Sequence, residues 1–175
     1  LPTPPWLAGR ASETIVAASI RLQTSAAMSI DAFAARLGDL EIFRGLSQAQ
    51  LSRIAREAER IVFRDGQEII RRGAEGDAAY LIISGSGEAM PVPDAGLDGQ
   101  SVAEGSLLGE MAMLIDHEYA VTVRAHGSVR SIRLPREMML RQLAMDPALA
   151  DHFVARISSR LTKVASTVMA WAAII

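Results

Sequence analysis

The chain contains no cysteine. This absence excludes disulfides, thiolate catalysis and zinc sites built on sulfur, and it fits a reducing compartment, so we predict a cytoplasmic location. Long apolar runs are also missing. The longest uncharged one, residues 164–175, is too short to cross a bilayer, since a spanning helix needs about 20 residues. We therefore expect no membrane span.

Neither sign of charge dominates, because 18 Lys and Arg against 20 Asp and Glu give a formal net charge of -2. Such a chain has no global attraction to nucleic acid or to acidic membranes. The arginines within residues 53–72 are interleaved with acidic residues, which predicts a solvated mixed-charge face rather than an anion groove. We expect no direct binding of nucleic acid by this chain.

The start of the chain lacks the features of a secretory signal. Residues 1–27 have no basic start and no small-residue cleavage site, and Glu13 interrupts their apolar stretch. Because the first residue is Leu1, the chain is either a fragment of something longer or extends upstream of a natural start at Met28. We interpret residues 1–27 as an N-terminal extension or linker.

The remaining chain is long enough for one domain with a sizeable core, since half of its residues are hydrophobic. Residues 28–58 are predicted to form N-terminal helices. Apolar residues follow helical spacing after Ser29, and Ser47 is a candidate N-cap for a second helix.

After Glu59 the apolar pattern changes from helical to strand-like, and glycines recur at short intervals. The predicted strands are residues 60–63, 68–70, 80–83, 88–92, 120–125 and 129–134. This pattern is typical of a compact all-β roll with tight corners, over residues 59–134. Pro91 and Pro93 are expected at an edge or a strand end.

Residues 135–175 are predicted to form C-terminal helices, the last one starting at Asp146 and Pro147. The apolar stripe of that last helix contains Leu149, Phe153, Ile157, Leu161, Val164, Val168, Trp171 and Ile175. It is longer than the roll can cover at about 1.5 Å per residue, so we predict a homodimer formed through this helix. The alternative is a helix packed on its own roll.

The segment most informative about function is residues 105–120. Gly109 has no side chain, so its backbone allows a phosphate to approach closely. The amides of Glu110, Met111 and Ala112 then open a short helix whose positive end points at that anion. The segment therefore predicts a cassette for a phosphate-bearing ligand.

This cassette, with Gly66, Gly73 and the turn at Gly76 and Asp77 before it, resembles the cyclic-nucleotide-binding domains. The family includes catabolite activator proteins of the Crp–Fnr type, cyclic-nucleotide-gated channels and protein kinase regulatory subunits. The resemblance covers residues 42–161. It implies a mainly β fold, a jelly-roll-like double-stranded β-helix with flanking helices. It also implies a bacterial regulatory domain that binds cAMP or cGMP and signals through its C-terminal helix.

In this family the glutamate after the glycine accepts a hydrogen bond from the ribose 2′-hydroxyl, and Glu110 stands in that place. An arginine ten residues after the glycine pairs with the cyclic phosphate, but here that position is Tyr119. Losing a charge-assisted hydrogen bond of about 1.5 to 3 kcal/mol predicts roughly 10- to 100-fold weaker binding. The ligand-binding residues implied by the resemblance are Gly109, Glu110, Met111, Ala112, Tyr119 and Ala120.

In an alternative interpretation, the chain has the same fold but binds no ligand. Glu110 would then bond backbone amides, and Tyr119 would fill the vacant pocket. The chain would serve as a dimerisation or protein-interaction module, or as the effector half of a larger transcription regulator, channel or enzyme. The natural ligand and the output partner stay open at this point.

Catalysis is not expected. The three histidines, His117, His126 and His152, are scattered, and neither a Gly-x-Ser-x-Gly motif nor a Walker loop is present. We accordingly predict no catalytic residues, no metal and no cofactor. A DNA-recognition helix is also missing from these residues, which agrees with the absence of direct nucleic-acid binding.

Overall fold

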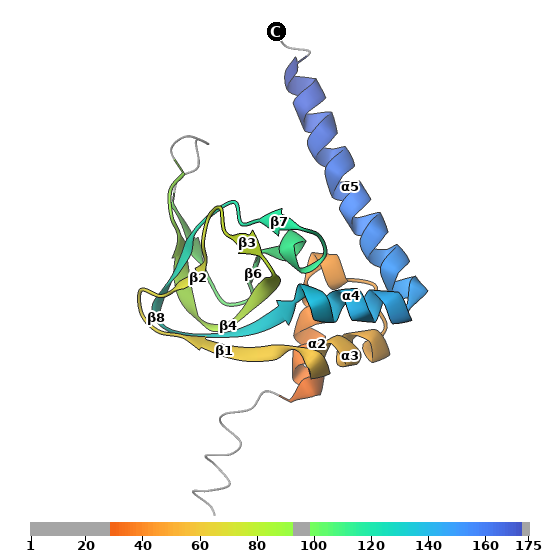
Figure 1. Cartoon of the computed structure of the whole chain (residues 1–175), viewed down its shortest axis with the longest axis horizontal. Coiled ribbons are helices and arrows are strands. Elements are labelled where there is room, and N and C mark those ends of the chain that lie inside the picture. Colours follow the sequence, from red (N-terminus) through yellow and green to blue (C-terminus); the bar gives the residue numbers. More distant parts are fainter. Residues whose placement is uncertain (1–28, 93–98, 173–175) are drawn as a thin grey trace, which may run out of the picture.

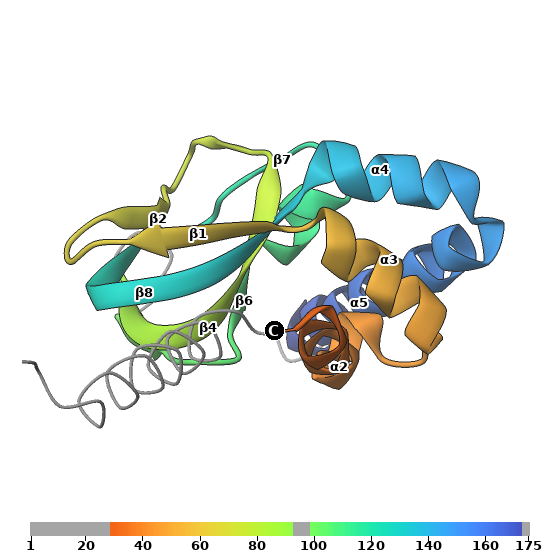
Figure 2. The same cartoon turned by 90° about the horizontal axis from the view of Figure 1, so that it is seen from below.

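The computed structural model describes residues 29–92 and 99–172, with only the backbone described for residues 160–172. Strands gather at one end of the molecule and helices at the other (Figure 1). The view from below shows the N-terminal and C-terminal helices side by side at the helical end (Figure 2). The predicted class, a mainly β roll with flanking helices, is confirmed; the predicted extension, residues 1–27, lies outside the described residues.

The N-terminal helices begin after Ser29, where the predicted helical spacing starts, and after Ser47, the predicted N-cap. They are α2 (Ile30–Asp39), the single turn η1 (Glu41–Phe43) and α3 (Gln48–Glu57). The Ser29 side chain accepts a hydrogen bond from the Ala32 amide, and Ser47 forms a reciprocal capping box with Gln50. Each cap satisfies an amide that the first helical turn would leave unpaired, so the serines fix where the helices start.

The strands of the described residues form a six-stranded and a two-stranded sheet, with every pair antiparallel. They are β1 (Glu59–Phe63), β2 (Glu68–Ile70), β3 (Glu75–Gly76), β4 (Ala78–Ala89), β5 (Gln100–Val102), β6 (Leu107–Leu108), β7 (His117–Glu118) and β8 (Val123–Pro135). Strand β8 pairs with β1, β2 and β4, while β4 also carries β5 and β6. The small sheet of β3 and β7 places β3 beside the predicted cassette.

The prediction of four separate strands in the two long segments was wrong. Residues 80–83 with 88–89 belong to β4, and residues 123–125 with 129–134 belong to β8. Gly85 and Gly127, at φ 92° and 66°, lie within these strands, and the register of β4 on β8 shifts on either side of Ser84. A bulge needs the same residue types as a turn, which explains the error. Pro91 follows the end of β4 as expected, and Pro93 lies outside the described residues.

The C-terminal helices are α4 (Arg136–Met145) and α5 (Pro147–Ala172). Leu149 and Phe153 of α5 are buried, and the Phe153 ring meets Phe43 edge-on with centroids 5.6 Å apart. His152 Nε2 lies 2.9 Å from the Ile42 carbonyl oxygen, which accepts its hydrogen bond. The first turns of the apolar stripe thus pack on their own domain. Among the described residues, we find no helix with the length and apolarity needed to cross a membrane.

Candidate functional site

The cassette backbone has the turn that the sequence predicts. Gly109, at φ 66° and ψ 31°, heads the short helix η3 (Glu110–Met113) in a left-handed conformation that residues with a Cβ adopt only under strain. The Ala112 amide donates a hydrogen bond to the Gly109 carbonyl at 2.9 Å and closes the first turn. That amide, which we predicted to face a ligand, is therefore engaged within the cassette itself.

Tyr119 is a buried residue of the roll, with 7% of its surface exposed. Its hydroxyl donates a hydrogen bond to the Ala78 carbonyl at 2.8 Å. Its backbone amide donates to the Ala74 carbonyl at 3.1 Å, and its carbonyl accepts from the Gly73 amide at 2.9 Å. The Tyr119 side chain, through its hydroxyl, and the Tyr119 backbone, through its amide and carbonyl, are thus hydrogen-bonded to residues 73–78, the segment around β3.

The Tyr119 ring lies directly against the cassette glycine. A Cβ on Gly109 would lie 2.6 Å from Cε1 of Tyr119, and a Cβ on Gly76 would lie 3.3 Å from the same atom. The Gly76 position is also closed by Ala112, whose Cβ would be only 2.5 Å away. Because Gly109 and Gly76 have no side chains, the Tyr119 ring can lie against the Gly109 turn from inside the roll.

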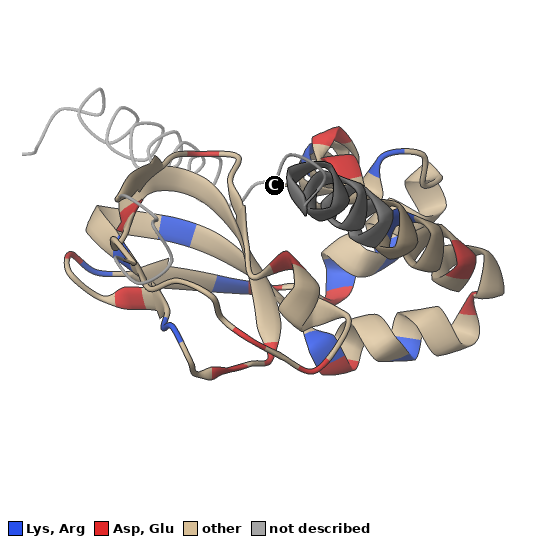
Figure 3. Ribbon diagram, turned by 90° about the horizontal axis from the view of Figure 1, so that it is seen from above, with Lys and Arg blue, Asp and Glu red and all other residues tan. Residues whose placement is uncertain are grey.

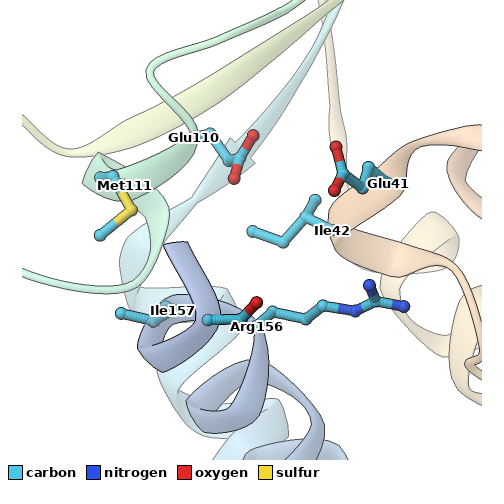
Figure 4. A pocket seen from close by; sticks show the side chains of 7 residues that line it. Glu41, Ile42, Glu110, Met111, Arg156 and Ile157 are labelled. Atoms are coloured by element: carbon cyan, nitrogen blue, oxygen red, sulfur yellow. The ribbon is translucent and has the colours of Figure 1, made fainter. Parts of the chain in front are cut away.

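Glu110 and Met111 lie where the cassette meets the helices. Both are half-buried, and they line a cavity of about 30 Å³ together with Glu41 and Ile42 of η1 and Arg156 of α5. Figure 4 shows these side chains around the cavity on the three elements. A cavity of this size holds about one water molecule. Glu110 therefore lies at a junction between the cassette and the helical end.

The structure brings only part of the predicted site together. Gly109, Ala112 and Tyr119 pack with one another in the roll, whereas Ala120 is exposed. Sequence reasoning missed Gly76 and Ala78, the partners of the Tyr119 ring and hydroxyl. The one sequence feature that could have indicated these partners was the glycine of the turn predicted at positions 76 and 77.

The surface of the described residues carries both signs of charge on the roll and on the helices (Figure 3). On the roll, Glu68 forms ion pairs with Arg71 and Arg124, with nitrogen–oxygen distances of 2.6 Å and 3.2 Å. Hydrogen bonds from Arg71, and then from Arg124, lower the pKa of Glu68. Within the described part of the chain, no group of three or more His, Asp or Glu side chains could hold a metal ion.

The fold and the cassette define a class of small β-roll modules with helices packed at one end. Residues 60–146 match the family model of the cyclic nucleotide-binding domain. The structure of a cyclic nucleotide-binding-like protein from Brucella abortus is 31% identical, with a TM-score of 0.58, over 65% of this chain and 99% of that one. The chain belongs to the cyclic nucleotide-binding domain family, and the predicted resemblance is confirmed.

Two further comparisons extend the similarity, one by sequence and one by fold. A cAMP-dependent protein kinase regulatory subunit of Mucor circinelloides is 34% identical over 110 residues, which are 61% of this chain and 25% of that protein. The N-terminal domain of a transcriptional regulator from Streptomyces coelicolor shares the fold at 19% identity, with a TM-score of 0.67, over 76% of this chain and 94% of that one. The chain spans about a quarter of the length of the curated relatives it matches.

Substitution of Gly109 by alanine tests the contact between the cassette turn and the Tyr119 ring. Gly105 is the matched control, because it also has a positive φ, 86°, but nothing lies within 4 Å of its missing Cβ. Both variants should lose about 1–2 kcal/mol from left-handed strain. Gly109→Ala should lose about 1–3 kcal/mol more from overpacking. Equal free energies of unfolding for both variants in urea titrations would contradict the contact.

Tyr119 should ionise later than an ordinary tyrosine, because burial raises its pKa to about 12. Between about pH 10 and 12 the unfolded chain loses this proton while the folded chain keeps it, so the free energy of unfolding should fall as the pH rises. Tyrosinate absorbance of the folded protein should show a late step that is missing in Tyr119→Phe. Ionisation of Tyr119 near pH 10 in the folded wild type would refute the burial.

Proposed function

We propose that this chain is a non-catalytic regulatory domain that binds cAMP or cGMP weakly at the cassette and signals through α5. The observation that carries the proposal is the Gly109 turn at the head of η3, within a roll of this family. Because Gly109 has no Cβ of its own, its backbone allows a phosphate to approach closely. The similarity to a regulatory subunit of a cAMP-dependent protein kinase supports a cyclic nucleotide as the ligand.

The weak binding of the nucleotide that we propose follows from the tyrosine at position 119. A neutral hydroxyl stands where relatives with the family motif carry a phosphate-pairing arginine, and that hydroxyl already donates to Ala78. Its ring also packs on Gly109, so a ligand at the turn has to move the ring or settle beside it. Arg124 does not replace the missing charge, because its side chain is 50% exposed and pairs with Glu68.

A second candidate function is a ligand-free interaction module. The observation that favours it is the burial of Tyr119, whose ring fills space in the roll and whose hydroxyl finds a partner in the chain itself. An interior completed in this way needs no ligand for its stability. In that case the cassette would be retained as a structural element.

We place the output in α5, and we assign the domain to a homodimer in the cytoplasm, within or beside a larger regulatory protein. Figure 1 shows α5 leaving the helical end and extending past the body of the molecule. Leu149 and Phe153 in its first turns pack on the domain, and the apolar stripe in the sequence continues beyond them. A ligand would shift the arrangement of α5 only by binding one arrangement more tightly than another.

Calorimetric titration of the whole chain with cAMP and with cGMP tests the ligand. Tyr119→Arg should bind roughly 10- to 100-fold more tightly than the wild type, because it restores a charge-assisted hydrogen bond. Tyr119→Phe is the control that removes the hydroxyl without adding charge. Saturable binding by the wild type establishes the weak sensor, whereas binding by Tyr119→Arg alone supports the second candidate. Failure of all three proteins to bind either nucleotide would sink the proposed ligand class.

Light scattering at several protein concentrations tests the homodimer. The wild type should have the mass of two chains, and Val164→Glu should shift it towards one, because position 164 lies on the apolar stripe of α5 in the sequence. Ser166→Glu adds the same charge off that stripe and should leave the mass unchanged. Equal masses for all three proteins would argue against association through this stripe.

A further inference from the structure

The turn between β3 and β4, residues 76–78, is held from two sides. On the cassette side, Gly76 packs on Ala112, and the Ala78 carbonyl accepts the Tyr119 hydroxyl. On the other side lies Arg136, the first residue of α4, whose amide donates to the Asp77 carbonyl at 2.7 Å. The turn is therefore the place where cassette and C-terminal helices meet through hydrogen bonds.

The Arg136 side chain extends this contact to the cassette exit, the segment of residues 114–116 that follows η3. Its Nη1 lies 3.0 Å from the Ile115 carbonyl oxygen, 3.0 Å from the Gly76 carbonyl oxygen and 2.7 Å from a carboxylate oxygen of Asp116. Its Nη2 lies 3.4 Å from a carboxylate oxygen of Glu75. One guanidinium thus joins β3, the cassette exit and α4.

We infer that Arg136 is a positioning residue that fixes the cassette exit on the first turn of α4. For its effect on ligand affinity this inference rests on the proposed function, but the positioning itself does not. In the sequence, Arg136 only falls at the start of the predicted C-terminal helices, residues 135–175. Its role comes from contacts between segments about 20 and 60 positions apart in the chain.

The bonds from Arg136 to the two carbonyl oxygens contribute more to this positioning than its ion pairs with the two carboxylates. The side chains of Asp116 and Glu75 are 92% and 83% exposed, and exposed ion pairs contribute little because water screens them. The Arg136 side chain is only 16% exposed and its bond to the Gly76 carbonyl is partly buried, so water screens that bond less than the two ion pairs. The guanidinium reaches these acceptors from two nitrogens held in one plane, whereas a lysine ammonium offers its donors from a single nitrogen.

Arg133 provides a matched control. Its side chain is 20% exposed and forms ion pairs with Glu59 and with Asp77, so it contacts the same turn. These partners lie on β1 and in the turn, not in the cassette. Loss of Arg133 should therefore loosen the turn without releasing the cassette exit.

Hydrogen exchange of the free protein tests the positioning without any ligand. The reporters are the Ile115 amide, bonded to the Met111 carbonyl, and the Tyr119 amide, bonded to the Ala74 carbonyl. Arg136→Gln should speed their exchange at least about tenfold, a ratio that corresponds to about 1.4 kcal/mol. Arg133→Gln should change them much less. Unchanged exchange in Arg136→Gln, or equal acceleration in both variants, would overturn the inference.

Arg136→Lys keeps the experiment decisive if Arg136→Gln does not fold. It retains the charge beside Asp116 and loses the planar fork, so it should accelerate the same two amides by an intermediate factor. Exchange at the wild-type rate in Arg136→Lys would also overturn the inference, because the carbonyl bonds would then be dispensable.

A titration in the Tyr119→Arg background separates this inference from the proposed function. If that variant binds cAMP, adding Arg136→Gln should weaken binding about tenfold, while adding Arg133→Gln should not. Accelerated exchange together with unchanged affinity would uphold the positioning and refute its consequence for the ligand. If no cyclic nucleotide binds, the proposed function fails and the exchange data still decide the role of Arg136.

Discussion

The packing of the Tyr119 ring on Gly109 is the contact on which the arrangement of the cassette depends. Gly109 and Gly76 both lack a Cβ, so the ring fits between them and its hydroxyl reaches the Ala78 carbonyl. This single side chain sets the spacing of η3, β3 and the start of β4. In this member of a ligand-binding family, the cassette is thus held in place by a side chain of the protein, that of Tyr119.

Local signals in the sequence predicted the features that depend on neighbouring residues. Ser29 and Ser47 mark the starts of α2 and α3, because a serine side chain is one of the few groups that satisfy the first free amides of a helix. The strand predicted at residues 68–70 coincides with β2, and the glycine of the cassette has the left-handed conformation that its motif requires. Each of these features depends on residues within a few positions.

Features that depend on distant partners were not predictable in the same way. Gly85 and Gly127 fall between strands that the sequence predicts as separate, and only the pairing of β4 with β8 shows that both lie within long strands. The sequence pointed to Tyr119 as a replacement for arginine but not to Ala78 as its acceptor, 41 positions away. Glu110 lies at a junction with η1 and α5 because of how the helices pack, which no local pattern encodes.

The central place of β8 also bears on how the roll assembles. β8 is the last of the described strands, yet it pairs with β1, β2 and β4, so three of the other five strands of the main sheet have a partner that is made late. Pairings between distant segments form slowly, and during synthesis the edges of β1 and β4 stay open until about residue 135 has left the ribosome. Nascent chains that stop before this point expose strand edges prone to association with other chains.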